Sequence, residues 1–453
     1  MSPALPPPRQ PAPPSPADAP AGDADTRRDA DPADRGGHAR LSGGNQVRLL
    51  AGGDELFPAM CLAIAGARHQ VWLATYIFHD DAAAQAIAEA LVEAARRGVW
   101  VGVVVDGFGS KASLPVLHRW LQNGGVNLAV FRPVDRWWRL LQPGQLRRLH
   151  HKLCVVDGEV GFVGGINVID DRNDLNHGWS DRPRLDFAVQ LQGPVVALVE
   201  QTARALWSRA ALGADWRDEV QQLWRSAEPL ARARRIAGRL RLPRSERQAA
   251  DAADALAQAA LPPMRAMLLV RDNLRRRRAI ELAYIDAIRS ASRRVDIVCP
   301  YFYPGQRFRR ALRQAAQRGV HVRLLLQGKV DYRFAALAAQ VLYDELLAVG
   351  VQVFEYTPAF LHAKVAVVDD DWATVGSSNI DPLSLLLNLE ANVVVRDAGF
   401  AGDLALRFEA AVAASREVVR PPVSRGGWSM LRRGFVAWTA HWFLRLAGMS
   451  GRY

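Results

Sequence analysis

Short apolar runs of strand length alternate along the chain with longer amphipathic stretches, and this pattern occurs twice. Residues 70–78 (QVWLATYIF) have a counterpart in 294–303 (RVDIVCPYFY). Both runs are rich in β-branched and aromatic residues, which is typical of buried strands. Residues 94–107 and 315–328 then each combine the end of a helix, an Arg-Gly stop and a further apolar strand.

Two more matched pairs follow in the same order, 124–131 with 349–356 and 148–167 with 360–379. Four matched pairs in one order indicate a duplicated β-α-β unit. We therefore expect an α/β protein with two duplicated α-β-α domains. Their sheets are expected to be mostly parallel, and the domains to pack against each other as a pseudo-dimer.

The remaining segments divide the chain into five parts. Residues 1–42 are rich in Pro and Ala, with hardly any large apolar residue, and predict a disordered tail. The two domains are expected at 43–212 and 263–420, joined by a helical connector at 213–262. Residues 421–453 form an amphipathic C-terminal segment.

Composition narrows the class of partner without fixing it. Hydrophobic residues make up 49% and charged residues 23%, which is typical of a globular protein. The net charge of +12 favours a polyanionic partner, either nucleic acid or an anionic membrane face. Three scattered cysteines exclude a disulfide framework or a thiolate zinc site. No apolar run reaches the length of a transmembrane helix.

A histidine, a lysine and an aspartate recur at fixed spacing in the last matched pair. They are His150, Lys152 and Asp157 in the first copy, and His362, Lys364 and Asp369 in the second. An asparagine follows each histidine after 17 residues, Asn167 in the first copy and Asn379 in the second. Strand alternation puts each histidine and its lysine on one face. The same alternation points each aspartate away, toward a turn that it would fix.

Two such sets facing each other would suit displacement at a phosphodiester. One imidazole would attack phosphorus while the other protonates the leaving oxygen. The lysines and asparagines would stabilise the charge that grows on the phosphoryl oxygens. The chain has no HExxH pattern and no carboxylate cluster, so no metal or other cofactor is expected. One copy alone could be a strand-turn-strand with an ordinary surface histidine, but two matched copies favour a site.

These residues resemble the paired HKD motifs of the phospholipase D superfamily. Residues 148–167 and 376–395 are similar to the bacterial cardiolipin synthases, most of all to the shorter type called B. The resemblance covers about residues 45–415. It implies a phosphohistidine mechanism, in which His150 is the nucleophile and His362 the acid and base.

The resemblance also assigns supporting roles. Asp186 and Glu390 would each orient one histidine, and Asn167, Asn379 and Ser377 would bind phosphate. Asp157 and Asp369 belong to the catalytic motifs, although alternation places them at turns. The chain departs from the wider superfamily at Gly165, where many members have serine although cardiolipin synthases often carry glycine. It also departs at His151, an extra histidine expected on the opposite face of its strand.

The resemblance implies a cardiolipin synthase that transfers a phosphatidyl group to the hydroxyl of phosphatidylglycerol. The donor would be phosphatidylglycerol or phosphatidylethanolamine. The expected partner surface is an anionic membrane, with nucleic acid unlikely, and the expected place is the cytoplasmic face of the bacterial cell membrane, bound peripherally. Competing interpretations are a hydrolytic phospholipase D, a nuclease of the same superfamily, and a non-catalytic scaffold that binds anionic lipid.

Two aromatic segments could provide the membrane contact. In 427–453, apolar residues recur at helical spacing between arginines: Leu431, Phe435, Trp438, Trp442 and Leu446. Such a helix lies at a headgroup boundary or packs on a core. The insertion at 134–144, VDRWWRLLQPG, would line a lipid access path or cover the core.

Overall fold

The computed structural model describes residues 41–134, 147–175, 178–211, 264–271, 277–328, 343–381 and 388–419. The expected tail up to residue 40, the connector, the C-terminal segment and most of the insertion at 134–144 lie outside these ranges, whereas Ser42, counted in the tail, begins the first strand. No helix among the described residues is long and apolar enough to cross a membrane.

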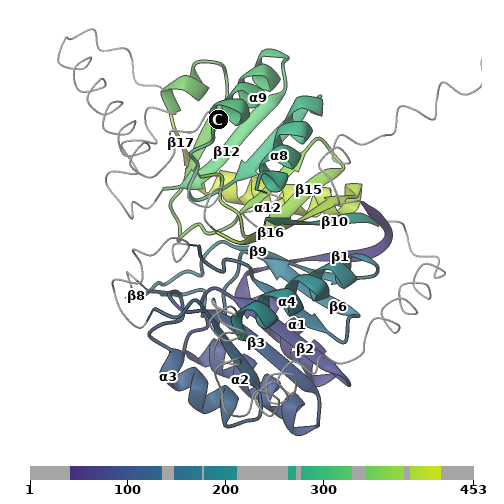
Figure 1. The fold of residues 1–453 in the computed structure, drawn as a ribbon. Coiled ribbons are helices and arrows are strands. Elements are labelled where there is room, and N and C mark those ends of the chain that lie inside the picture. The colour runs from purple at the N-terminus through teal and green to yellow at the C-terminus, as the bar shows by residue number, and fades with distance from the viewer. Residues whose placement is uncertain are drawn as a thin grey trace, which may run out of the picture.

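The first half of the chain folds around a sheet with helices on both faces (Figure 1). Its strands are β1 (Ser42–Ala51), β2 (Gln70–Thr75), β3 (Trp100–Asp106), β4 (Asn127–Phe131), β5 (Leu153–Val156), β6 (Val160–Gly164) and β9 (Phe187–Gln192). A separate hairpin consists of β7 (Asn173–Asp174) and β8 (Gly178–Trp179). The helices are α1 (Gly52–Ala65), α2 (Ala82–Arg96), α3 (Leu114–Leu117), the short π-helix η2 (His118–Gln122) and α4 (Val195–Ala211).

The second half repeats this arrangement. Its strands are β10 (Met264–Arg271), β11 (Arg294–Val298), β12 (His321–Gln327), β13 (Gln352–Tyr356), β14 (Val365–Val368), β15 (Trp372–Gly376), β16 (Glu390–Arg396) and β17 (Ser415–Glu417). Its helices are α8 (Ala279–Ser290), α9 (Gln306–Gln317) and α12 (Ala398–Ala413).

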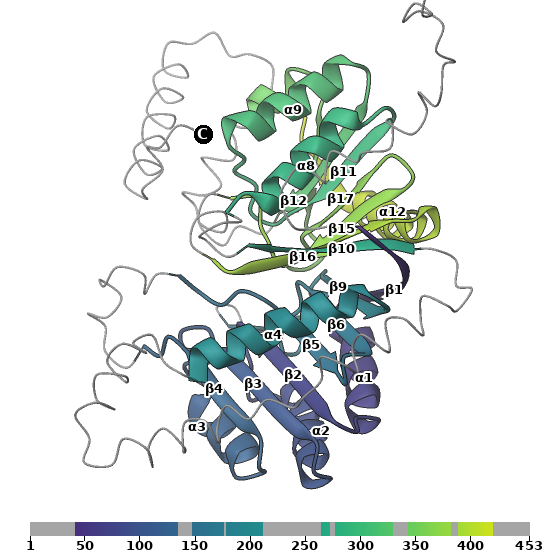
Figure 2. The same ribbon diagram turned by 45° about the vertical axis from the view of Figure 1, so that its right-hand side comes forward.

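Strand order shows the duplication directly. The first half runs β4-β3-β2-β5-β6-β9-β1, and the second half runs β13-β12-β11-β14-β15-β16-β10. The two sheets join where β1 pairs antiparallel with β10, so one sheet of 15 strands passes through both halves (Figure 2). The predicted α/β class and the duplication are confirmed.

The expectation of mostly parallel sheets is wrong. Within the large sheet as the structure describes it, parallel pairing of strands is confined to β2-β3-β4 and to β11-β12-β13, and the other neighbouring strands are antiparallel. The reason is local: β5-β6 and β14-β15 are hairpins closed by the turns at Asp157 and Asp369. Each turn has only three residues, 157–159 or 369–371, and so short a connection can join only antiparallel strands.

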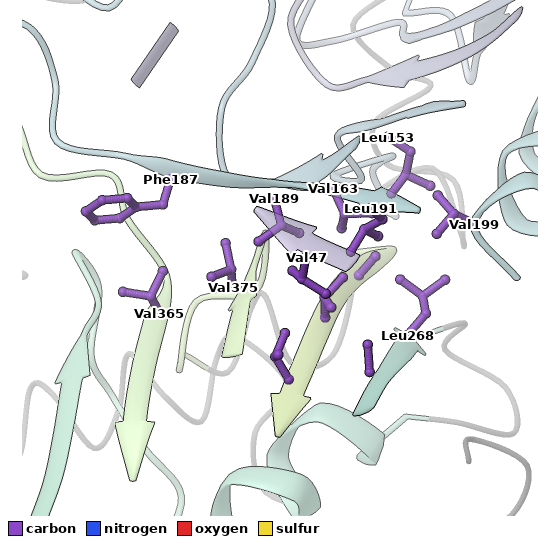
Figure 3. Packing of buried hydrophobic residues seen from close by; sticks show 14 of the residues in the cluster. Val47, Leu153, Val163, Phe187, Val189, Leu191, Val199, Leu268, Val365 and Val375 are labelled. Atoms are coloured by element: carbon purple, nitrogen blue, oxygen red, sulfur yellow. The ribbon is translucent and has the colours of Figure 1, made fainter. Parts of the chain in front are cut away.

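The central hydrophobic core belongs to both halves. It contains β1, β6 and β9 side chains such as Val47, Val163 and Val189, together with Leu268 and Val375 from the second half, all nearly inaccessible to solvent. Figure 3 shows these side chains from the two sheets facing one another. Helices α4 and α12 cover this core, while α1 and α2 pack on the outer face of the first sheet and α8 and α9 on that of the second. The shared core holds the two halves in one fixed relation, which the site requires.

Candidate active site

Each histidine motif lies in extended chain just before a strand and is hydrogen-bonded to the other half. Leu149 pairs with Leu389 as an isolated bridge, and the His150 N–H donates to the Leu389 carbonyl at 3.0 Å. The second motif mirrors this, because Leu361 pairs with Leu185 and the His362 N–H donates to the Leu185 carbonyl at 2.9 Å. Both motifs therefore lie at the boundary between the halves.

The histidine-carboxylate pairs cross this boundary. Nδ1 of His150 is 2.9 Å from Oε2 of Glu390, and Nδ1 of His362 is 2.6 Å from Oδ2 of Asp186. A carboxylate only accepts, so each imidazole donates from Nδ1 and keeps the lone pair on Nε2. Each half thus supplies the acid that orients the histidine of the other, and both Nε2 atoms are available for nucleophilic or base chemistry.

Burial sets the charge states of these pairs. It lowers the pKa of His362 to about 3 and also lowers the pKa of His150, with the paired carboxylates opposing the shift. Burial would raise the pKa of Glu390, but His150 and Lys152 more than offset it and leave that pKa below its ordinary value. The pKa of Asp186 is likewise lowered, because His362 and Lys364 outweigh burial. At neutral pH each empty half-site therefore holds a neutral imidazole and a carboxylate.

Both motif lysines are buried beside the histidines. Nζ of Lys152 donates to the His150 carbonyl at 2.9 Å, and Nζ of Lys364 donates to the His362 carbonyl. Burial lowers the pKa of Lys152 to about 7 and that of Lys364 to about 8. An anion entering the site would restore the charged form of both, so the lysines are suited to bind phosphate.

Tyr76 completes the first half-site and was missed by sequence reasoning. Its ring centroid is 5.2 Å from that of His150 and 5.6 Å from Nζ of Lys152. The residue directly follows β2, at the carboxyl end of a parallel strand, where functional side chains often gather. This position at the end of a parallel strand is the sequence signal that could have identified Tyr76 as a site residue.

The expected phosphate ligands differ in their surroundings. Oδ1 of Asn167 accepts the Ile77 N–H at 3.2 Å, which leaves its amide nitrogen for other contacts. Oδ1 of Asn379 is buried and has no partner within the described residues. The Ser377 hydroxyl, in contrast, is fully buried and donates to Oε2 of Glu390 at 2.5 Å. Its contacts favour holding Glu390 in place over binding phosphate.

Gly165 occupies the position that corresponds to Ser377. A Cβ atom there would lie 2.2 Å from Oδ1 of Asp186. The glycine therefore permits the close approach of this shorter carboxylate. The glycine at this position thus has a physical reason: one half-site combines Asp186 with Gly165, and the other combines Glu390 with Ser377.

Asp157 and Asp369 lie at turns, away from the histidines, as strand alternation predicts. Both have positive φ, 53° and 51°. Asp157 accepts the N–H groups of 68–70 at 2.7–2.8 Å, and Asp369 accepts those of 292–294. These aspartates tie each hairpin turn to the start of the neighbouring strand.

The extra histidine, His151, is buried, and burial lowers its pKa to about 3. Within the described residues no three His, Cys, Asp or Glu side chains gather as metal ligands.

Comparisons with known proteins place this site in a family. The family described as "Cardiolipin synthase, PLD-like domain" matches residues 60–178 and again 284–412. Cardiolipin synthase B of Salmonella typhi is 38% identical over 79% of this chain and 78% of its own length. Cardiolipin synthase B of Escherichia coli K12 is 35% identical over 87% of each chain. The crystal structure of phosphatidylserine synthase from Haemophilus influenzae has the same fold, with a TM-score of 0.61, 12% identity, and coverage of 92% of this chain and 98% of its own. The chain belongs to the cardiolipin synthase family of phospholipase D-like proteins.

Proposed function

We propose that this chain is a phosphatidyltransferase that makes cardiolipin, with phosphatidylglycerol as the acceptor and a phosphohistidine as the intermediate. The observation that carries the proposal is the pair of crossed dyads, His150 with Glu390 and His362 with Asp186, each beside a buried lysine. The similarity to cardiolipin synthase B over most of both chains supports the same activity.

The first step forms the intermediate. Nε2 of His150 attacks phosphorus, the bond to the headgroup oxygen breaks, and His362 gives that oxygen a proton. His362 is neutral in the empty site, but the negative charge of the bound phosphodiester raises its pKa and favours protonation. Lys152 and Lys364, with the amides of Asn167 and Asn379, stabilise the charge on the phosphoryl oxygens.

The second step reverses the roles. His362 takes the proton from the hydroxyl of the acceptor lipid, whose oxygen attacks phosphorus as the bond to His150 breaks. Water could replace the lipid with the same chemistry at phosphorus, so the product depends on which hydroxyl reaches the intermediate. We assign the acceptor role to a lipid on the strength of the family similarity.

The location follows from the substrates. Phospholipid substrates require access to a bilayer, and we propose peripheral attachment at the cytoplasmic face of the bacterial cell membrane. The aromatic segments expected to make the contact lie almost wholly outside the described residues. The donor is proposed to be phosphatidylglycerol, with phosphatidylethanolamine as the other candidate.

Lipid analysis of cells tests the proposal. Mass spectrometry of a strain lacking its own cardiolipin should show cardiolipin after expression of this chain. The His150→Ala variant, expressed to the same level, should leave the profile at background. Wild-type expression that raises phosphatidic acid but no cardiolipin would contradict the proposal.

A further inference from the structure

The two half-sites hold the backbone before the histidine with different side chains. In the second half, Oε1 of Gln327 accepts the Leu361 N–H at 3.0 Å. In the first half, Oδ2 of Asp106 accepts the Leu149 N–H at 2.8 Å from the corresponding position. An uncharged amide thus makes the same contact with the backbone. The Asp106 carboxylate adds a negative charge, and its Oδ1 also accepts the N–H groups of Phe108 and Gly109 at 2.8 and 3.2 Å.

That charge comes with arginines found only in the first half. Nη1 of Arg148 is 3.7 Å from Oδ1 of Asp106 and donates to the Arg132 carbonyl at 3.4 Å. The guanidinium of Arg148 also stacks on Phe108, with its carbon 5.2 Å from the ring centroid. The positions that correspond to Arg148 and Arg132 in the second half are Phe360 and Thr357, both uncharged.

Within the described residues, the guanidinium groups near Asp106 are not fully paired. Nη2 of Arg148 and Nη1 of Arg132 are buried and have no hydrogen-bond partner within the described residues. Burial lowers the pKa of Arg132 to about 10, and repulsion from Arg209, Arg147 and Arg148 adds to the shift, opposed by Asp106. We call Arg132, Arg147, Arg148 and Arg209 the arginine cluster. Asp106 is the carboxylate that contacts Arg148, and the two buried guanidinium nitrogens without a partner among the described residues suit the cluster to take up an anion.

The arginine cluster lies next to the reacting centre. Arg148 precedes His150 by two residues of extended chain, a separation of about 7 Å. Alternation places both side chains on the same side of that chain. An anion on the cluster would therefore flank a phosphoryl group attached to His150 without occupying the same place.

We propose that the arginine cluster binds the phosphate of the acceptor lipid. This inference rests on the proposed function. The donor phosphate occupies the space between the two histidines and lysines, and only a phospholipid acceptor brings a second one. In phosphatidylglycerol the glycerol headgroup separates that phosphate from the attacking hydroxyl, so a second anion site beside His150 orients the hydroxyl toward phosphorus. Arginine suits this role because its planar fork matches two phosphate oxygens.

Competition between two acceptors tests the proposal. The full chain is given dioctanoyl phosphatidylglycerol together with deuterated glycerol. Transfer to the lipid yields cardiolipin, and transfer to glycerol yields deuterated phosphatidylglycerol. The ratio of these products reports how the intermediate selects its acceptor, because donor binding affects both equally.

The test variant is Arg132→Thr, which introduces the residue that the second half carries. Its ratio of cardiolipin to deuterated phosphatidylglycerol should fall about tenfold, as expected for the loss of one charge-assisted hydrogen bond. The control variant Arg48→Gln, at an exposed arginine on β1, should keep the wild-type ratio. An unchanged ratio in Arg132→Thr would overturn the proposal.

A binding measurement separates this inference from the proposed function. If the wild type transfers to neither alcohol, the proposed function fails, but calorimetry with inorganic phosphate still tests the cluster. The wild type should bind two phosphate ions, one at the histidines and one at the arginine cluster, and Arg132→Thr should bind one. Equal stoichiometry in the two proteins would refute the arginine cluster as an anion site.

Discussion

Glu390 begins β16 in the second half of the chain, yet its carboxylate holds Nδ1 of His150, from the first half, at 2.9 Å. Asp186 and His362 form the reciprocal pair. Neither half therefore contains a complete dyad, and activity should require both halves assembled through their common core.

Replacing Glu390 tests its role in positioning the histidine. Glu390→Gln keeps the shape but removes the charge that fixes the His150 tautomer and stabilises its cation. We expect kcat to fall by about 10²–10⁴, the usual contribution of general acid–base catalysis, with loss of the corresponding triad acid lying at about 10⁴, the upper end. The pH profile of kcat/KM should also shift, which a purely structural defect would not cause. Glu93→Gln, at an exposed residue of α2, is the control. Activity within threefold of wild type would show that the dyad is dispensable.

The lysines predict an alkaline limit to substrate capture. In the proposed mechanism their charged forms bind phosphate, and in the free enzyme burial lowers the pKa of Lys152 to about 7 and of Lys364 to about 8. Because kcat/KM reports the free enzyme, it should decline as pH rises through 7 and 8. Lys152→Arg should move the onset of this decline to higher pH, since arginine stays charged, while the maximum rate stays well below wild type.

Lys111→Arg, at an exposed lysine, serves as the control for that variant. A Lys152→Arg protein with near-normal activity would show that only charge matters at this position. A flat profile between pH 6 and 9 in the wild type would refute the assignment of the alkaline limit to the lysines.

Gly165→Ser should damage the second dyad. Its Cβ would lie 2.2 Å from Oδ1 of Asp186 and must displace the carboxylate that holds His362. A misplacement of about 1 Å can cost about 10²-fold in rate. We expect a loss of at least ~10-fold. Gly402→Ser in α12 meets no atom within 4 Å and should leave turnover unchanged. A Gly165→Ser protein with normal turnover would mean that Asp186 has room to move.

Asp369→Ala should affect stability more than chemistry. The variant removes the acceptor for three backbone N–H groups and for the Ser292 hydroxyl. We expect the free energy of unfolding to drop by about 1–3 kcal/mol, measured by denaturant titration, with turnover per folded molecule within twofold of wild type. Asp403→Ala, at an exposed position of α12, should leave both unchanged. A stable but inactive Asp369→Ala protein would place the aspartate in the chemistry after all.

The sequence was most informative where a pattern is local and repeated. Strand alternation predicted which of His150, Lys152 and Asp157 share a face, and the repeat predicted two half-sites. The crossing of the dyads could not be predicted in this way, because their partners are 240 and 176 residues apart. An apolar run does not indicate whether a strand pairs parallel or antiparallel with its neighbours. For this reason the prediction of mostly parallel sheets was wrong.

The residues that sequence reasoning missed act through three-dimensional contacts. Tyr76 falls inside the predicted buried strand at 70–78, and nothing in the sequence separates Arg148 from the many other arginines of this basic chain. Only the neighbours of each, His150 for Tyr76 and Asp106 for Arg148, distinguish them from other residues of the same type. The role of Ser377 similarly depends on its contact with Glu390.

The central claim is that the intermediate is opened by a lipid hydroxyl, and product analysis on phosphatidylglycerol vesicles tests it most directly. The purified chain is incubated with vesicles, and cardiolipin, phosphatidic acid and free glycerol are quantified, with His150→Ala as the blank. We predict cardiolipin as the main lipid product, with one glycerol released for each cardiolipin formed. Phosphatidic acid as the main product, with vesicles intact and acceptor in excess, would contradict the account and identify a hydrolytic phospholipase D.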